Sequence, residues 1–166
     1  MSFDLRSRNY SNFKLSSAES LVYTQAFVKE VLRVSPIVPV VIHSTLEDFR
    51  WRNFHVQKRT QFGANILALH HSIAWTGANE FNVNRWLGDA AASIPTQSYA
   101  PFGFGPRACV AEKYLLNLLT GILAVLLYHN YFEKTTVLPE PTAGTFGLAN
   151  LPPKCSLKAT PLSARS

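Results

Sequence analysis

The sequence predicts a mainly α-helical fold with small antiparallel β-sheets, an α+β arrangement. Two segments, Leu21 to Val34 and Tyr114 to Tyr128, have apolar residues at helical spacing. The segments between and after them are rich in β-branched and aromatic residues and are broken by polar clusters, which is typical of short strands. With 166 residues, of which 47% are hydrophobic and 16% charged, the chain is expected to fold around a core.

Composition excludes several classes of function. The net charge of +6 would permit acidic partners, but no basic run exceeds Lys58-Arg59, so a nucleic-acid partner is not expected. Two cysteines, at positions 109 and 155, do not form a disulfide framework, and residues 1–16 are a polar segment without a signal sequence, so we expect an intracellular protein. The run Tyr114 to Tyr128 is shorter than the ~20 residues of a membrane span and is predicted to be a core helix.

The first predicted helix runs from Ser17, a candidate N-cap, to Ser35-Pro36, where proline ends the pattern. It carries Glu30 and Arg33, which lie three residues apart and can pair on one face. Taken alone, such a pair is a surface ion pair worth at most about 1 kcal/mol.

Short strands are predicted within Val38 to Ile42 and Arg52 to His71. On a strand, the adjacent His70 and His71 would point to opposite faces, which disfavours a shared metal site. Further edge strands are expected at Phe132 to Val137, Thr145 to Leu148 and Cys155 to Ala159.

The main candidate site is the stretch Pro101 to Ala111, which leads into the second helix. Gly103 and Gly105 permit a tight loop, and Cys109 is expected in the first turn of the helix, where unpaired N–H groups favour an anionic thiolate that can bind a metal. Arg107 offers donors suited to a carboxylate or phosphate. The alternative is a small buried cysteine in an ordinary loop.

This stretch resembles the haem-binding loop of the cytochrome P450 family, which has the pattern Phe-x-x-Gly-x-Arg-x-Cys-x-Gly. Phe102, Gly105, Arg107 and Cys109 match in register, and Ala111 replaces the last glycine. The resemblance implies that Cys109 is the thiolate ligand of haem iron. It also implies that Phe102 packs near the sulfur and that Arg107 faces a haem propionate.

Weaker similarities occur elsewhere in the chain. The stretch Glu30 to Pro39 resembles the family's K-helix with its Glu-x-x-Arg motif, and Phe81 to Trp86 resembles the segment that supplies a third member, here Arg85. The resemblance implies that these three charged residues, Glu30, Arg33 and Arg85, support the haem pocket. His43 falls where the family has a propionate-binding residue, and Arg59 replaces a turn glycine.

The resemblance covers Ser20 to Arg165, about the C-terminal third of the family's usual length. Residues 17–166 are therefore expected to be the haem-binding C-terminal part of the fold, from the K-helix through the L-helix to the terminal strands. The distal-helix pattern Ala/Gly-Gly-x-Asp/Glu-Thr does not occur in the sequence. The implied activity is that of a haem-thiolate monooxygenase, which takes electrons from a reductase or ferredoxin and inserts oxygen into an apolar substrate. The alternative is a truncated, non-catalytic haem-binding or interaction protein.

Overall fold

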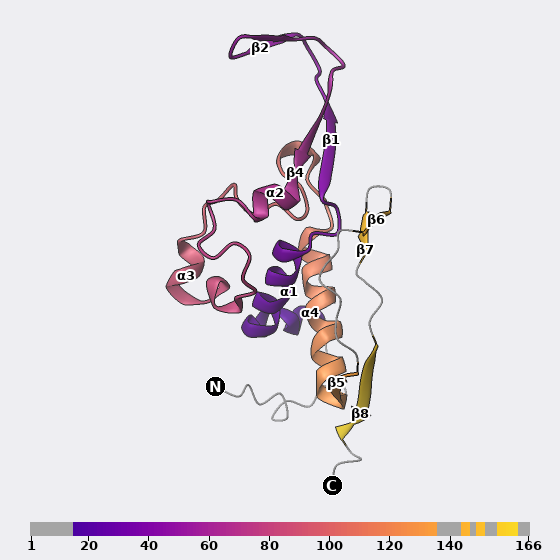
Figure 1. Ribbon diagram of the computed structural model, residues 1–166. Coiled ribbons are helices and arrows are strands. Elements are labelled where there is room, and N and C mark those ends of the chain that lie inside the picture. Colours follow the sequence, from indigo (N-terminus) through magenta and orange to yellow (C-terminus); the bar gives the residue numbers. More distant parts are fainter. Residues whose placement is uncertain (1–14, 136–143, 147–148, 152–155, 163–166) are drawn as a thin grey trace.

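Two helices lie side by side at the centre of the computed structural model, which describes residues 15–135, 144–146, 149–151 and 156–162 (Figure 1). They are α1 (Val22–Val34) and α4 (Glu112–His129), and they contact each other. The remaining helical elements are short: η3 (Leu15–Ser20), α2 (Ile66–His70), η4 (Val83–Trp86), α3 (Gly88–Ala92) and η5 (Gly105–Arg107).

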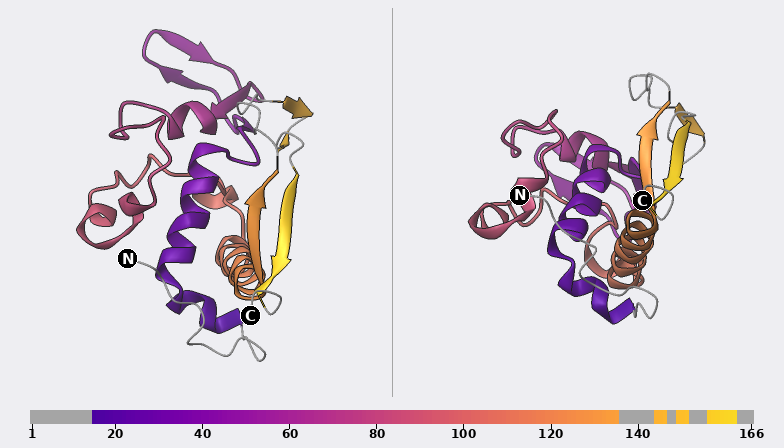
Figure 2. Two further views of the ribbon diagram at one scale, coloured as in Figure 1. Left: turned by 60° about the horizontal axis from the view of Figure 1, so that its bottom comes forward. Right: turned by 90° about the horizontal axis from the view of Figure 1, so that it is seen from below.

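The strands form four antiparallel pairs. β1 (Val40–Ser44) pairs with β4 (Gln61–Asn65), and β2 (Phe49–Trp51) pairs with β3 (Phe54–Val56), so that the second pair projects from the first, away from the helices (Figure 1). β5 (Asn130–Lys134) follows α4 directly and pairs with β8 (Leu157–Pro161), as Figure 2 shows from two further directions. The last pair is β6 (Gly144–Phe146) with β7 (Ala149–Leu151). The predicted α+β class with small antiparallel sheets is confirmed.

Helix α1 ends as predicted but begins differently. Its C-cap is Ser35, directly before Pro36, as the proline pattern requires. The predicted N-cap Ser17 lies instead within η3, and Leu21 caps α1 without a side-chain hydrogen bond. The buried face also differs from a simple apolar stripe, because α1 buries Glu30 and Arg33 completely. The helix therefore packs against groups that form hydrogen bonds with these two charged side chains.

Helix α4 was predicted to lie in a core, and this holds for one face only, on which Ala124 is fully buried in an apolar cluster with Leu21. Its buried positions are small or polar: Asn117, Thr120, Gly121 and Ala124. Small side chains allow α4 to approach α1 and η3 closely, while the bulkier side chains on its other faces remain 37–57% exposed. They are Tyr114, Leu119, Ile122, Leu126 and Leu127.

The strand predicted to continue to His71 ends at Asn65, where α2 begins. The Asn65 side chain accepts a hydrogen bond of 2.8 Å from the N–H of Ala68, which is an N-cap that starts a helix. His70 is the last residue of α2 and His71 is its C-cap. Their expected alternation across a strand is therefore wrong.

The turn between β3 and β4 holds Arg59 in the left-handed region, with φ 67°. This conformation costs a residue with a side chain about 1–2 kcal/mol, whereas glycine adopts it freely. We expect Arg59→Gly to raise the free energy of unfolding by roughly 0.5–1 kcal/mol, because the greater backbone entropy of glycine in the unfolded chain offsets part of the strain that is removed. The measurement is the urea midpoint, which should be higher. Arg50→Gly, in strand β2, is the matched control and is expected to lower the midpoint. A lower midpoint for Arg59→Gly would contradict this account of the turn.

Parts of the predicted C-terminal region lie outside the described residues. This applies to Cys155 and to the ends of the strands predicted at Phe132 to Val137 and Thr145 to Leu148. Residues 1–14 of the polar N-terminal segment also lie outside the described residues. Among the residues that are described, no helix is both long enough and apolar enough to cross a membrane.

Candidate functional site

The cysteine loop, Ala100 to Cys109, is closed by backbone hydrogen bonds. The N–H of Gly103 donates to the carbonyl of Ala100 at 3.0 Å, and the N–H of Cys109 donates to the carbonyl of Phe102 at 2.9 Å. Gly103 and Gly105 have φ values of 78° and 72°, which only glycine adopts without strain. These two conformations turn the chain so that Cys109 returns beside Phe102.

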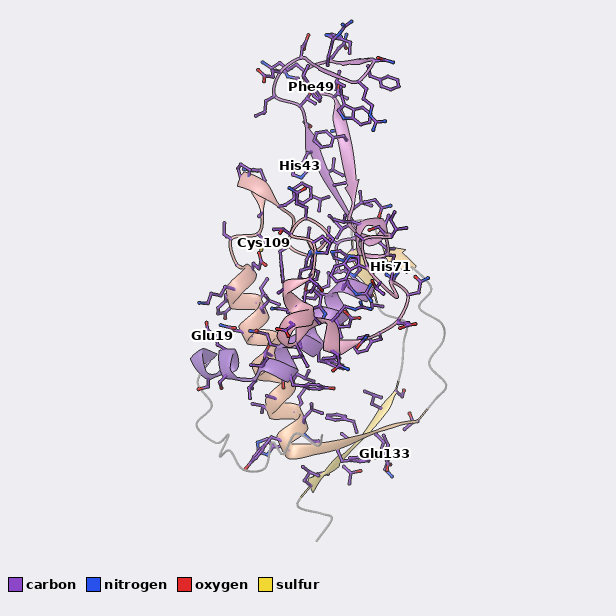
Figure 3. All side chains as sticks on the ribbon, turned by 90° about the vertical axis from the view of Figure 1, so that its left-hand side faces the viewer. Glu19, His43, Phe49, His71, Cys109 and Glu133 are labelled. Carbon is purple, nitrogen blue, oxygen red and sulfur yellow. The ribbon has the colours of Figure 1, made fainter. Side chains whose placement is uncertain are left out.

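Cys109 has a free, exposed thiol. It lies three residues before the first residue of α4, Glu112, whose N–H points to the Cys109 carbonyl at 3.4 Å. The prediction that Cys109 lies in the first helical turn is therefore wrong, because a turn at Val110 and Ala111 separates the loop from the helix. Figure 3 shows Cys109 at one end of α4, on the side that carries the β1–β4 ribbon.

The other residues of the loop pattern come before the cysteine in the sequence and differ in exposure. Arg107 is exposed in η5, and Phe102 is half-buried. Gly105 has no atom within 4 Å of the place where a Cβ would lie, so its conformation rather than crowding requires glycine. The loop thus presents a thiol and a guanidinium at the surface of the described chain.

His43 lies on β1, where its ring stacks on Phe62 of β4 with 5.7 Å between centroids. In the part of the chain that the structure describes, no hydrogen bond or ion pair joins His43 to the cysteine loop. Figure 3 shows His43 on the ribbon above Cys109. A role for His43 at a propionate remains a prediction.

Glu30, Arg33 and Arg85 come together in one cluster, which we call the carboxylate cluster. Arg33 binds both carboxylate oxygens of Glu30, from Nε and Nη2, at 2.9 Å each. Arg85 Nε lies 3.1 Å from Glu30 Oε1. Both side chains of the Glu30–Arg33 pair are fully buried, so this is not the surface pair that the spacing alone suggested.

Two further donors complete the carboxylate's environment: the backbone N–H of Asn82 at 2.8 Å and the indole N–H of Trp86 at 2.8 Å. Burial alone would raise the pKa of Glu30, but the hydrogen bonds from Arg33, Asn82 and Trp86 hold that pKa below its ordinary value. Glu30 is therefore ionised at neutral pH.

The guanidinium groups of the cluster also bind the chain that follows α2. Arg33 donates to the carbonyls of His70, Ala78 and Glu80 at 2.7–2.9 Å. Arg85 donates to the carbonyls of Thr76 and Gly77 at 2.9 and 3.0 Å. Irregular backbone between α2 and η4 is thereby fixed to α1.

An aromatic group around this segment was not predicted as a unit. Trp86 lies 4.5 Å from Tyr99 and 5.6 Å from Trp75 between ring centroids, and Tyr99 stacks on His70 at 5.3 Å. Arg33 and Arg85 both lie over Trp75, at 5.3 and 5.8 Å from its centroid. The aromatic content between positions 75 and 99 was visible in the sequence, but no periodicity indicated that these rings meet.

The fold resembles that of solved cytochrome P450 heme domains. The structure described as a cytochrome P450 (CYP102L1) has a TM-score of 0.79, is 21% identical, and is matched over 93% of this chain and 35% of its own. A cytochrome P450DA heme domain gives a TM-score of 0.78 at 22% identity, over 92% of this chain and 34% of its own. The fold is therefore of the P450 heme-domain type.

Sequence comparison leads to the same family. The family model described as Cytochrome P450 matches residues 5–159. Steroid 17-alpha-hydroxylase/17,20 lyase of Oryzias latipes is 35% identical over 153 residues, which are 89% of this chain and 30% of that protein. The enzyme of the same name from Rattus norvegicus is 37% identical over 64% of this chain and 22% of its own length.

The chain belongs to the cytochrome P450 family. Membership implies haem as the cofactor and monooxygenase chemistry as the reaction of the family, whose members generally use redox partners and hydrophobic substrates. The chain spans about a third or less of the length of the relatives it matches.

Proposed function

We propose that the chain is the haem-binding part of a cytochrome P450 monooxygenase, with the thiolate of Cys109 as the iron ligand. The observation that carries the proposal is the exposed, free thiol of Cys109 on a loop closed by the bond from its N–H to the Phe102 carbonyl. This bond fixes the backbone of Cys109 relative to that of Phe102.

The available donors fit haem better than a bare metal ion. Within the described residues, no group of three or more His, Cys, Asp or Glu side chains could hold a metal ion. A porphyrin would itself supply most of the ligands of its iron, so a single cysteine, Cys109, would be sufficient from the protein. An exposed Arg107 two residues away offers a fork of donors for a propionate.

The remaining roles are proposed from the resemblance to the family together with the positions described above. Gly105 shapes the loop, Phe102 holds the cysteine N–H, and His43 is proposed as a second propionate partner. The carboxylate cluster fixes the segment between α2 and η4 against α1. When bound, a haem with a thiolate ligand supplies the chemistry of O–O bond cleavage.

We further propose an apolar small molecule as substrate and a reductase or ferredoxin as the electron donor. The support is family membership. Turnover with an added reductase would distinguish an enzyme from a haem-binding chain without activity.

The test is the ferrous–CO spectrum of the chain reconstituted with haem. We expect the wild-type chain to give the red-shifted Soret band of a thiolate-ligated haem and Cys109→Ser to lose it, because a serine hydroxyl does not replace the thiolate. Cys155→Ser, which leaves one cysteine in the chain, is the matched control and should keep the band. Retention of the band by Cys109→Ser, or no haem uptake by the wild type, would refute the assignment.

A further inference from the structure

His70 joins two parts of the site that are far apart in sequence. It is the last residue of α2, and its side chain is fully buried. Its Nδ1 lies 3.1 Å from the carbonyl oxygen of Arg33, and its Nε2 lies 2.9 Å from the backbone nitrogen of Ala100. One ring therefore contacts both the helix of the carboxylate cluster and the beginning of the cysteine loop.

The protonation of the ring follows from its two partners. A carbonyl oxygen only accepts a hydrogen bond, so Nδ1 must carry a hydrogen and donate it to Arg33. A backbone N–H only donates, so Nε2 must be unprotonated and accept from Ala100. The neutral ring with hydrogen on Nδ1 satisfies both partners at once. Tyr99 stacks on one side of the ring and holds its plane.

The Ala100 end of this connection continues to Cys109. Ala100 is buried, and its carbonyl accepts the N–H of Gly103 at 3.0 Å. One residue before that glycine, the carbonyl of Phe102 accepts the N–H of Cys109 at 2.9 Å. A series of hydrogen bonds thus leads from the backbone of α1, through His70, to the backbone of the cysteine.

We propose that His70 is a positioning residue for the cysteine loop, and that its Nε2, by accepting from Ala100, sets where the loop presents Cys109. The side chain acts through the backbone and does not itself contact a cofactor. The effect on haem rests on the proposed function, whereas the effect on the loop does not.

Two substitutions separate the two ends of the ring. In His70→Asn, the amide nitrogen can replace Nδ1 and donate to Arg33, but nothing reaches Ala100. In His70→Gln, the amide oxygen can reach the place of Nε2 and accept from Ala100. Asn and Gln carry the same amide group and differ by one methylene, so the pair compares the two ends of the ring with the same chemistry.

The first measurement is amide hydrogen exchange of the full chain without haem. We expect His70→Asn to speed exchange at Ala100 and Cys109 by about tenfold relative to His70→Gln, because a buried N–H loses its acceptor. The amide of Leu115, bonded to the Ala111 carbonyl at 2.8 Å, is the internal control and should differ little between the variants. Equal exchange at Ala100 and Cys109 in both variants would overturn the proposal.

The second measurement uses the wild-type chain and needs no variant to fold. The ¹⁵N shifts of the His70 ring should show a protonated Nδ1 and an unprotonated Nε2. A proton on Nε2 would overturn the proposal, because that atom could not accept from Ala100.

The third measurement is the ferrous–CO spectrum with haem. We expect His70→Gln to keep a larger share of the thiolate-type Soret band than His70→Asn. If the wild type takes up no haem, the proposed function fails and the exchange result still decides the role of His70. If the wild type gives the thiolate band while exchange is the same in both variants, the proposed role of His70 is refuted and the proposed function stands.

Discussion

Glu30→Gln is expected to lower the free energy of unfolding by about 3–5 kcal/mol, the usual cost of removing one partner from a buried ion pair. Two guanidinium groups, those of Arg33 and Arg85, would then lie in a protein interior beside a neutral amide. The amide nitrogen would also face donors, because both carboxylate oxygens of Glu30 only accept. Five hydrogen bonds converge on them, from Arg33 Nε and Nη2, Arg85 Nε, Trp86 Nε1 and the Asn82 N–H.

The measurement is the urea midpoint of the full chain, with Glu19→Gln as the matched control. Glu19 also pairs with a cation, Lys113 Nζ at 3.0 Å, but its carboxylate is exposed, so its loss should change the midpoint little. Since a domain has only about 5–15 kcal/mol of stability, Glu30→Gln could leave the chain largely unfolded. Trp86→Phe removes one of the five donors and is expected to cost about 1–3 kcal/mol. A loss below about 1 kcal/mol for Glu30→Gln would show that the cluster is a minor contributor.

The second large effect is a loss of stability in mild acid that depends on His70. Burial lowers the pKa of His70 from its ordinary value of 6.5 to about 4, and the positive charge of Arg33 and the neighbouring His71 add to the effect. The aromatic ring of Tyr99, stacked on the other side, offers no compensating charge. Protonation would also place a second hydrogen on Nε2, against the N–H of Ala100.

The direction of the pH dependence follows from which state binds the proton. Between pH 6.5 and pH 4, His70 binds a proton in the unfolded chain but not in the folded chain. The contribution of His70 to the free energy of unfolding is therefore fully present above pH 6.5 and falls as the pH is lowered. The total loss is expected to reach roughly 3 kcal/mol near pH 4. Urea midpoints at several pH values would measure it.

Acid changes the charge of many groups at once, so the informative quantity is a difference. We expect the stability difference between wild type and His70→Asn to shrink as the pH falls from 7 to 4. His55→Asn, at an exposed position, is the control for the loss of a histidine side chain from the surface. A pH-independent difference for His70→Asn would mean that the folded chain binds the proton as readily as the unfolded one.

The parts of the site that depend on local patterns could be predicted from the sequence. The loop with Gly103, Gly105 and Cys109 was predictable because a motif of fixed spacing requires particular backbone conformations. The pairing of Glu30 with Arg33 was predictable because residues three apart share a helix face. The proximity of Arg85 depended on resemblance to a family, because nothing local connects position 85 to α1.

What could not be predicted depends on contacts between distant segments. The sequence around His70 has strand-like composition, and only the Asn65 cap converts it to a helix. The full burial of Glu30 depends on donors at positions 82 to 86, and no local rule places them there. The exposed leucines of α4 are a further example. Apolar composition indicates which side chains a helix can bury, but it does not show which other elements pack against that helix.

The contacts of Glu30 with Asn82, Arg85 and Trp86 also restrict the conformational entropy of the chain between α1 and these residues. They span 52, 55 and 56 residues, so each closes nearly the same long loop. Closing a flexible loop of that length costs about 3.5 kcal/mol from the length-dependent term, and the cost grows slowly with length. Because the three partners lie within five residues of one another, this cost arises once for all three bonds. The carboxylate thus acts as a non-covalent cross-link between α1 and residues 82–86, beside the bonds from Arg33 to the carbonyls of Ala78 and Glu80.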